Sequence, residues 1–555
     1  MTGEKVDAAG ATDAAPRRYR AGTLLLPEHA PAGTTSVATI GDRIVAIGSD
    51  DECAAALPTD HEVVELGGAT LAPGFVDAHV HPLVMCVFER QLVLGQVRSI
   101  ADVLDAVADQ AAGSPRDRAV IGFQLDDDLL AERRLPTAAE LDHAGGGRPV
   151  VLIRRDGHHA VGSTSAFVAA GLAPAGSDPA GGRVERDASG QPTGLAREHA
   201  VAPLLSLLPD PDFDDLLAGL TSWSQRLLRQ GVTSISAICQ TTPEGPSGGA
   251  GALESVAWSV FVEQLPFDIQ TILIAPELQA LHDARDTPLH RPDLGRRVDA
   301  VKLFLDGTLG GRTACMHHPF SDDHSTSGMA TIDESVAQQR VLDAHVEGLQ
   351  VCLHAIGDRA NDQALDLLEN AIRRHPGPHR HRVEHASVLT PRAIERFAEL
   401  GVTAVVQPIS LRSEQRWLGS RLGDRLGRVY PFRDLLDAGA TVAGSSDAPI
   451  EPTDVLAAMA TAVDRPLAPE QAVTGADALA MYTTGGAAAR MTEDRLGRLA
   501  VGHRADLVVL SDDPTTCAPA AIADIDVLRT VVGGRTRFDR AGDPQFDHAG
   551  DPHRD

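Results

Sequence analysis

Two histidines close a run of apolar residues in the segment GFVDAHVHP, at positions 79 and 81. Side chains two residues apart on a β-strand point to the same side, so His79 and His81 would present both imidazoles to one place. Imidazole is a common ligand of zinc and of neighbouring divalent metals. A single buried histidine is more often a hydrogen-bonded core residue, but this pair favours a metal site.

Four further residues of suitable chemistry stand where other apolar segments end. They are Lys302 in DAVKLFLDG, His354 in LQVCLHA, His385 in HRVEHA and Asp447 in GATVAGSSDAP. If these segments are strands of one barrel, their carboxyl ends meet at one face, and the four residues would join the histidine pair in one metal centre. Asp447 could instead cap a helix, because SSDAP is also a typical helix start.

Lys302 stands out because the chain has only one other lysine, Lys5, among 49 basic residues. Burial lowers the pKa of an amine, and a neutral amine can add carbon dioxide to form a carbamate with two oxygens, which a guanidinium cannot do. We hypothesise that Lys302 is N6-carboxylated and bridges two metal ions. The alternative is a buried lysine paired with Asp306, which would still allow a site for a single metal ion.

Eight apolar segments, most of them followed by a helical pattern, predict the elements that position these residues. The segments are PGFVDAHVH, GVTSISA, FDIQTILIA, DAVKLFLDG, LQVCLHA, HRVEHA, GVTAVVQP and GATVAGSSDAP, with helices such as DESVAQQRVLDAHVEG and PRAIERFAELG between them. This alternation predicts an α/β fold with a (β/α)8 barrel over residues 73–485. A long interval after the first strand predicts a large insertion, about residues 86–215, that covers or walls the site.

Short apolar runs separated by turns occur at both ends of the chain. Residues 19–72 contain several such runs, with a hairpin expected at Gly41-Asp42, and residues 486–541 contain a matching group. We expect the two groups to pair into one small sheet domain. The remaining ends, residues 1–18 and 542–555, are polar and are expected to be flexible tails.

The composition excludes several classes of partner. The chain has 555 residues and a net charge of −28, which opposes binding to nucleic acid or to an anionic membrane. It has no apolar run long enough to span a membrane and no apolar core of a signal peptide near the start. Its six cysteines are scattered, without a Cys-x-x-Cys pair, which is typical of the reducing cytoplasm. We therefore expect a cytoplasmic protein with a small-molecule substrate.

Several of these segments resemble the signature strands of the amidohydrolase superfamily. They are GFVDAHVHP, VKLFLDG, LHAIGDRA, RVEHA and GSSDAP, and LPTAAELD, RRDGHHAVGSTSAF, GGRVERDASGQPTGLARE, GGRTA and LGRLAVGHRADLVVL add to the resemblance. The chain is most similar to the YtcJ-like branch, amidohydrolase family 3, which includes N-substituted formamide deformylase, over nearly all of residues 20–540. One departure is the pair Ser236 and Ala237, where relatives often carry a polar His-Asp pair.

The resemblance implies a metal-dependent hydrolase with a distorted barrel and a small β-sandwich domain built from both termini. It implies cleavage of a C–N bond, in an amide, an N-substituted formamide or a related small molecule, by a metal-activated hydroxide. One or two divalent ions, zinc by default, would be the cofactor, and Asp447 would act as general base and acid. Arg312 and His158 are candidates for substrate binding, against the alternatives of a surface arginine and a packed histidine. Relatives often dimerise, so a homodimer is the assembly compatible with the resemblance.

Other functions stay open at this point. A deaminase, or a hydrolase of cyclic amides or carbamates, would belong to the same superfamily, but deaminases typically use a glutamate near the fifth strand, where LHAIGD has none. A non-catalytic scaffold would be expected to have lost metal ligands, and none is missing here. The acidic run LDDD at residues 125–128 is interpreted as a solvated helix start rather than as a set of metal ligands.

Overall fold

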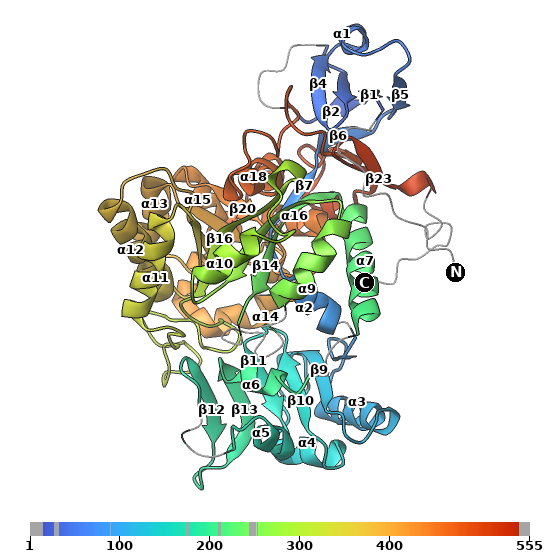
Figure 1. The fold of residues 1–555 in the computed structure, drawn as a ribbon. Coiled ribbons are helices and arrows are strands. Elements are labelled where there is room, and N and C mark those ends of the chain that lie inside the picture. Colours follow the sequence, from blue (N-terminus) through green and yellow to red (C-terminus); the bar gives the residue numbers. More distant parts are fainter. Residues whose placement is uncertain are drawn as a thin grey trace.

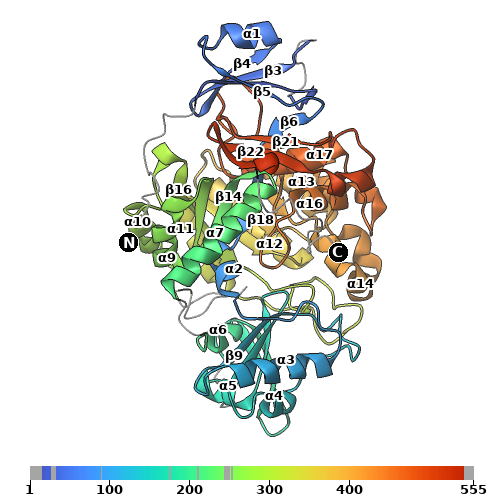
Figure 2. The ribbon, with the colours of Figure 1, turned by 90° about the vertical axis from the view of Figure 1, so that its right-hand side faces the viewer.

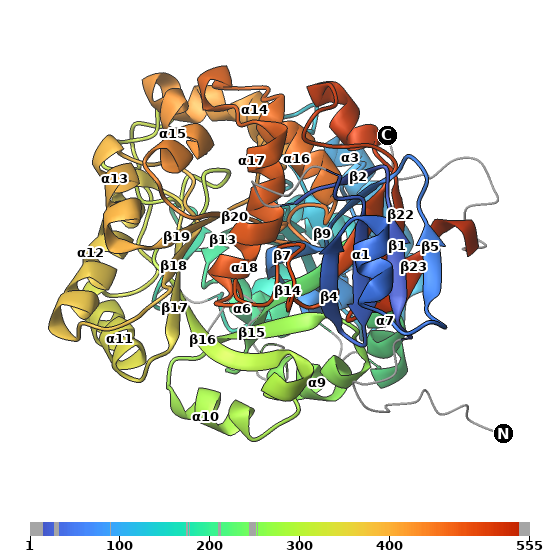
Figure 3. The same ribbon diagram turned by 90° about the horizontal axis from the view of Figure 1, so that it is seen from above.

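The centre of the computed structural model is an eight-stranded parallel sheet that curves into a barrel (Figure 3). The structure describes residues 15–26, 33–88, 90–173, 176, 178–208, 212–242, 251 and 254–542. The barrel strands, in spatial order, are β7 (Phe75–Val80), β14 (Val232–Gln240), β15 (Asp268–Ile274), β16 (Arg296–Phe304), β17 (Gln350–Ala355), β18 (Arg382–His385), β19 (Thr403–Val406) and β20 (Val442–Gly444). All eight predicted strands are confirmed, in the predicted order.

The first and last strands meet just beyond their carboxyl ends. The backbone N–H of Asp447 donates to the carbonyl of His79 over 2.8 Å, and the N–H of His81 donates to the carbonyl of Ala448 over 2.9 Å. These bonds bring Asp447 beside the histidine pair of β7, and the barrel is nearly closed.

Helices surround the barrel on its outer side (Figure 3). They are α2 (Pro82–Phe88), α7 (Phe213–Arg229), α9 (Glu254–Phe261), α10 (Gln279–Arg285), α11 (Glu334–Val346), α12 (Asp358–Arg374), α13 (Pro391–Leu400), α14 (Ser410–Leu422), α15 (Phe432–Asp437), α16 (Val455–Val463), α17 (Gly475–Ala480) and α18 (Gly486–Ala489). Among the described residues, no helix combines the length and apolar character needed to cross a bilayer.

The predicted helices α11 and α13 begin and end where their sequences dictate. The Asp333 side chain accepts hydrogen bonds from the backbone N–H groups of Ser335 and Val336 and so caps α11. Thr390 caps α13, and this helix ends at Gly401, whose φ of 62° suits a residue without Cβ. Capping and turn chemistry therefore set the helix ends that frame the parallel strands.

The insertion after β7 is a separate layered unit with its own mixed sheet. Its sheet has the order β12-β13-β11-β10-β9-β8. The strands are β8 (Leu92–Val93), β9 (Val120–Leu125), β10 (Val150–Arg154), β11 (His159–Gly162), β12 (Gly182–Arg186) and β13 (Pro192–Glu198), and the helices are α3 (Ile100–Gly113), α4 (Ala138–Ala144), α5 (Thr164–Ala169) and α6 (Val201–Leu205). It lies at one end of the barrel, and the terminal sheets lie at the other (Figures 1 and 2).

Two small sheets lie at the opposite end of the molecule, and one of them combines strands from both ends of the chain (Figure 2). One has the order β4-β3-β1-β5, and the other has the order β2-β6-β21-β22-β23, in which β21 lies antiparallel between β6 and β22. Their elements are β1 (Arg17–Arg20), β2 (Thr23–Leu24), β3 (Ser36–Ile40), β4 (Arg43–Gly48), α1 (Asp50–Ala55), β5 (Glu62–Glu65), β6 (Thr70–Pro73), β21 (Leu507–Leu510), β22 (Val527–Val532) and β23 (Arg535–Asp539). The predicted hairpin joins β3 to β4, and Gly41 has a φ of 59° in its turn.

Candidate metal centre

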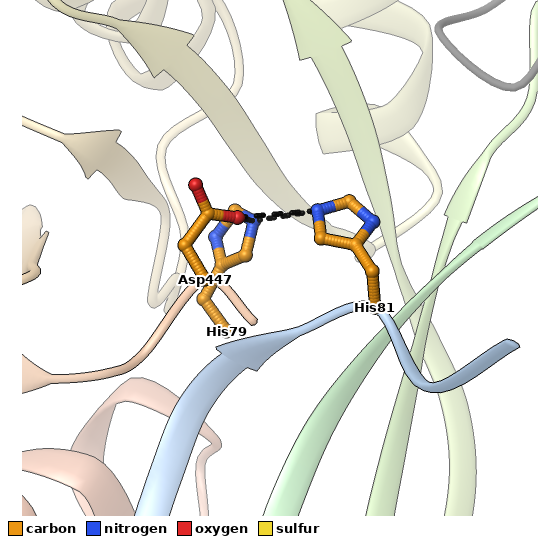
Figure 4. A group of neighbouring side chains, drawn as sticks. All are labelled: His79, His81 and Asp447. Carbon is orange, nitrogen blue, oxygen red and sulfur yellow. Dashed lines mark hydrogen bonds and ion pairs between the residues drawn. The ribbon is translucent and has the colours of Figure 1, made fainter. Parts of the chain in front are cut away.

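His79, on β7, and His81, which directly follows this strand, point to the same side, as their spacing predicts (Figure 4). The Nε2 atoms of His79 and His81 lie 3.3 Å apart, and each lies 3.3 Å from Oδ1 of Asp447. Nδ1 of His79 lies 2.5 Å from Oε2 of Glu384, and this contact orients the ring so that Nε2 faces Asp447. Burial lowers the pKa of His81, so its imidazole is also available as a neutral ligand.

Asp447 joins this pair from the segment that follows β20. Its φ of 56° lies in the left-handed region, which turns its carboxylate back toward β7. Burial raises the pKa of Asp447, but the neighbouring imidazoles of His79, His81 and His385 outweigh that effect and hold the pKa well below its ordinary value. Asp447 is therefore ionised at neutral pH.

His385 and His354 extend the cluster to the sixth and fifth strands. The ring centroid of His385 lies 4.5 Å from that of His354 and 5.2 Å from that of His79. Nδ1 of His385 lies 3.0 Å from Oε1 of Gln407, and burial lowers the pKa of His385 to about 3. Nε2 of His354 lies 3.2 Å from the carbonyl of Gly307. Burial also holds the pKa of His354 well below its ordinary value, so both rings are neutral, with their other nitrogens left for a ligand.

Lys302 is buried on β16 and is only 2% exposed. Its Nζ has no hydrogen-bond partner among the described residues and lies 4.9 Å from the ring centroid of Phe304. Burial lowers the pKa of Lys302, although Glu384 and Asp447 act in the opposite direction.

The alternative of an ion pair between Lys302 and Asp306 is wrong. The carboxylate of Asp306 instead accepts hydrogen bonds from the backbone N–H groups of Cys315, Ile356 and Gly357, at 2.8 to 3.0 Å. Lys302 is thus a buried amine that no carboxylate in the described part of the chain neutralises.

All six candidate residues line one cavity of about 150 Å³. The cavity thus gathers four imidazoles and one ionised carboxylate. It also holds two buried nitrogens without a hydrogen-bond partner among the described residues, Nζ of Lys302 and Nδ1 of His354. Divalent metals of the zinc type prefer this set of nitrogen and oxygen donors, and buried nitrogens without partners are costly unless something binds them. The residues present therefore fit a divalent metal.

His158 lies in the wall of the same cavity, on the loop that precedes β11. Its ring centroid lies 5.2 Å from that of His354, and its Nδ1 lies 2.6 Å from Oε2 of Glu198. Burial lowers the pKa of His158, but the carboxylate of Glu198 outweighs this effect and raises the pKa to about 9. The insertion thus contributes a charged imidazole to the cavity.

Arg312 lies outside the lining of this cavity. Its guanidinium makes two hydrogen bonds to the carboxylate of Asp322, at 3.1 and 2.7 Å, and its side chain is 35% exposed. It is not among the residues that line the cavity. The geometry therefore gives no support to Arg312 as a substrate-binding residue.

Two glycines after β16 let the chain pass close to the insertion. A Cβ at Gly307 would lie 2.0 Å from Oε1 of Glu198, and a Cβ at Gly311 would lie 1.7 Å from Cε1 of His159. Any side chain at either position would displace the insertion from this loop. The glycines of the segment DGTLGG therefore allow His158 to reach the cavity.

The acidic run at residues 125–128 was expected to be a solvated helix start, and this expectation is wrong. Asp126, Asp127 and Asp128 follow β9 in a turn at the edge of the cavity. Arg154 binds two of them, with Nε 2.7 Å from Asp127 and one terminal nitrogen 3.2 Å from Asp128, and it also binds Asp156 over 2.9 Å. The carboxylates hold the insertion loops together instead of facing water.

Several residues of the site were not identified from the sequence. Glu384 orients His79, Gln407 orients His385 and Glu198 orients His158. The segment RVEHA placed Glu384 beside His385, but two neighbours on a strand normally face opposite sides. The φ of 73° at His385 breaks that alternation, and nothing in the sequence indicated it.

Comparison with known proteins agrees with this geometry. The family model described as "Amidohydrolase family" matches residues 62–538. The chain is 32% identical to putative amidohydrolase YtcJ of Bacillus subtilis, over 86% of this chain and 91% of that protein. It is 28% identical to N-substituted formamide deformylase of Arthrobacter pascens, over 91% of this chain and 95% of that protein. The resemblance inferred from the motifs is confirmed.

A solved structure shares the fold. It is an uncharacterized metal-dependent hydrolase from Pyrococcus horikoshii OT3, with a TM-score of 0.70 and 25% sequence identity. The match covers 91% of this chain and 99% of that one. The barrel, the insertion and the terminal sheets therefore belong to an arrangement found in another protein.

Proposed function

This chain belongs to the amidohydrolase family and is a hydrolase, and from that premise we propose that it cleaves a C–N bond of a small molecule. The substrate class would be amides, N-substituted formamides or related compounds. The observation that carries the proposal is the gathering of His79, His81, Lys302, His354, His385 and Asp447 around one cavity. An amine leaves only when it is protonated, so the cavity must both activate water and move a proton.

We infer that these six side chains hold one or two divalent ions, zinc first among them. Such an ion lowers the pKa of a water molecule from 15.7 to about 7 and polarises a carbonyl group. Lys302 has no carboxylate partner, and its burial favours the neutral amine that reacts with carbon dioxide. As a carbamate, Lys302 would contribute two oxygens and a negative charge to the centre.

The chain's own residues would move the proton and hold the substrate. Asp447 is ionised and lies within 3.3 Å of both histidines of β7, so it can accept a proton from water and pass it to the leaving nitrogen. His158 is held by Glu198 through Nδ1, which leaves its Nε2–H to donate a hydrogen bond to the substrate's carbonyl oxygen.

Deamination of a heterocycle is the second candidate, and the cavity favours it less. The residues that follow β17 are Ile356, Gly357 and Asp358, so the glutamate typical of deaminases is missing there. Asp358 instead accepts the backbone N–H of His317 over 2.8 Å. Hydrolysis of a cyclic amide or carbamate needs the same groups as the leading proposal, and a substrate screen separates the two.

The deciding experiment couples metal analysis to a hydrolysis screen over N-formyl amines, simple amides and cyclic amides. We expect one or two equivalents of divalent metal and amine release from at least one compound. Asp447→Asn should lower kcat by about a thousandfold, whereas Asp105→Asn, on the exposed face of α3, should not change it. Metal-free protein, or full activity in Asp447→Asn, would overturn the proposal.

The carbamate has its own test. Lys302→Ala should lose both activity and metal, and a short carboxylic acid such as acetate should restore part of both, because it supplies the two missing oxygens. The same acid should not restore activity to His354→Ala, which lacks an imidazole instead. A carbamate signal in the carbon-13 NMR spectrum of the folded wild-type protein, equilibrated with labelled bicarbonate, would give direct support, and absence of that signal would contradict the hypothesis.

A further inference from the structure

One wall of the cavity carries charged residues that the proposed reaction does not use. Glu414 lies on α14, Glu451 lies four residues after Asp447, and Arg155 lies on the insertion loop after β10. All three line the same cavity as the candidate metal centre. They therefore face whatever part of a substrate extends away from the scissile bond.

Both carboxylate oxygens of Glu451 have partners. Its Oε2 lies 2.5 Å from a terminal nitrogen of Arg155, and its Oε1 accepts the hydroxyl of Ser413 over 2.6 Å. Only 5% of Glu451 is exposed. Arg155 and Glu451 thus neutralise each other.

Glu414 has no charged partner of this kind among the described residues. Its Oε2 accepts the hydroxyl of Tyr430 over 2.8 Å, and this is its one hydrogen bond to the described residues. No Lys, Arg or His side chain in the described part of the chain forms an ion pair with it. Its Oε1 is therefore free to accept a further donor, because Arg155 is paired with Glu451 and Arg421 with Asp128.

The surroundings of Glu414 make its negative charge costly. Burial raises the pKa of Glu414 to about 7, and the nearby carboxylate of Glu451 adds to that effect, whereas Tyr430, Arg155 and Arg421 oppose it. A cation next to Oε1 would remove this cost, whereas an anionic group would increase it.

We propose that Glu414 binds a positively charged nitrogen of the substrate and selects substrates that carry an ammonium group away from the scissile C–N bond. This inference rests on the proposed function, since it names the substrate class of the same cavity. Tyr430 lines the wall beside Glu414, whereas the ring of Trp417 already lies against the guanidinium of Arg421, 4.1 Å from its centroid. Glu414 would be a specificity residue and would take no part in bond cleavage.

Three probes of matched length test the charge preference. They are N-formyl-1,4-diaminobutane, which carries a terminal ammonium, N-formylpentylamine, which ends in a methyl group, and N-formyl-5-aminopentanoate, which ends in a carboxylate. Binding is measured by calorimetry on the metal-loaded protein, with Asp447→Asn used for any probe that is hydrolysed. We expect the ammonium probe to bind at least tenfold more tightly than the methyl probe, as a charged hydrogen bond implies.

Glu414→Gln keeps the shape of the side chain and removes its charge. We expect the tenfold preference to fall below twofold in this variant, while binding of the methyl probe stays unchanged. Glu399→Gln, on the exposed face of α13, is the matched control and should keep the preference. Equal affinities in the wild type, tighter binding of the carboxylate probe, or a preference that survives Glu414→Gln would each overturn the inference.

The pH dependence gives a second measurement. The ammonium probe stays protonated between pH 6 and 8, so its affinity relative to the methyl probe should rise with pH as Glu414 ionises. The ratio of the two affinities removes the titration of the metal centre, which affects both probes equally. A ratio that does not change with pH in the wild type would contradict the role of Glu414. Absence of hydrolysis with every probe would contradict the formamide part of the proposed function instead, because these affinities do not depend on turnover.

Discussion

His385 and Asp447 differ from the other candidate ligands in their backbone conformation. Both have positive φ, 73° and 56°, and such conformations in residues other than glycine are held by their surroundings, often at functional sites. The spacing of His79 and His81 was enough to predict that they act together. His385 and Asp447 could be predicted only from their positions at the ends of strands. The sequence carries no sign of the turn that aims their side chains.

Glu384 shows what residue-level reasoning missed. It is fully buried, and it binds Nδ1 of His79 on one side and the guanidinium of Arg382 on the other. Burial raises the pKa of Glu384, but Arg382 and His79 outweigh this and hold the pKa well below its ordinary value. A buried ion pair inside a barrel has no periodic pattern, so its partners become visible only in three dimensions.

Replacing Glu384 by Gln should both destabilise the fold and weaken metal binding. The change leaves the buried charge of Arg382 without a partner, which costs about 3 kcal/mol of unfolding free energy. It also releases the imidazole of His79. Urea unfolding and metal analysis measure the two effects. Glu493→Gln removes an exposed partner of Arg380 and should cost less than about 1 kcal/mol. Wild-type stability and metal content in Glu384→Gln would show that His79 needs no such support.

At the scale of elements, the insertion was predicted in position but not in structure. The long interval after the first strand indicated its presence, and the glycines near residue 307 fit its close approach to the barrel. Its sheet could not be predicted because β9 and β10 pair in parallel across a long connection. That pairing is what brings the turn at residues 126–128 and the loop at residues 154–158 to one edge of the cavity.

Arg154→Met should disconnect these two loops. The guanidinium of Arg154 is buried and binds Asp127, Asp128 and Asp156, so its loss leaves three carboxylates close together without their shared cation. We expect at least a tenfold loss of kcat/KM and faster hydrogen exchange in residues 122–130 and 154–160. Arg183→Met, on the exposed side of β12, is the control and should change neither. Unchanged exchange in both segments would mean that packing alone holds the loops.

At the scale of the whole molecule, one buried carboxylate ties the barrel to the chain that returns to the terminal sheets. Asp268 begins β15 and is fully buried. It lies 2.7 Å from a terminal nitrogen of Arg490 and 2.7 Å from one of Arg495, and Arg504 is 3.9 Å away. The sequence predicted that the two ends of the chain would pair, but partners more than two hundred positions apart cannot be assigned from composition or periodicity.

This cluster predicts a specific dependence of stability on pH. Burial raises the pKa of Asp268, but Arg490, Arg495 and Arg504 outweigh this and hold the pKa below its ordinary value. A lowered folded-state pKa gives stability that is fully present above the unfolded value of about 3.9 and is lost as pH falls through the folded value. Asp268→Asn, which leaves Arg490 buried without its partner, should cost about 3 kcal/mol at pH 7.

Urea unfolding at pH 7, 5, 4 and 3 tests both parts of this prediction. The gap between wild type and Asp268→Asn should stay constant from pH 7 to pH 5 and shrink below about pH 4, because a protonated Asp268 resembles the uncharged amide. Asp366→Asn, which removes an exposed partner of Arg396, should lie within about 1 kcal/mol of wild type at each pH. A gap that keeps its size at pH 3 would mean that Asp268 acts through packing, and the charge cluster would then not be what joins the barrel to the returning chain.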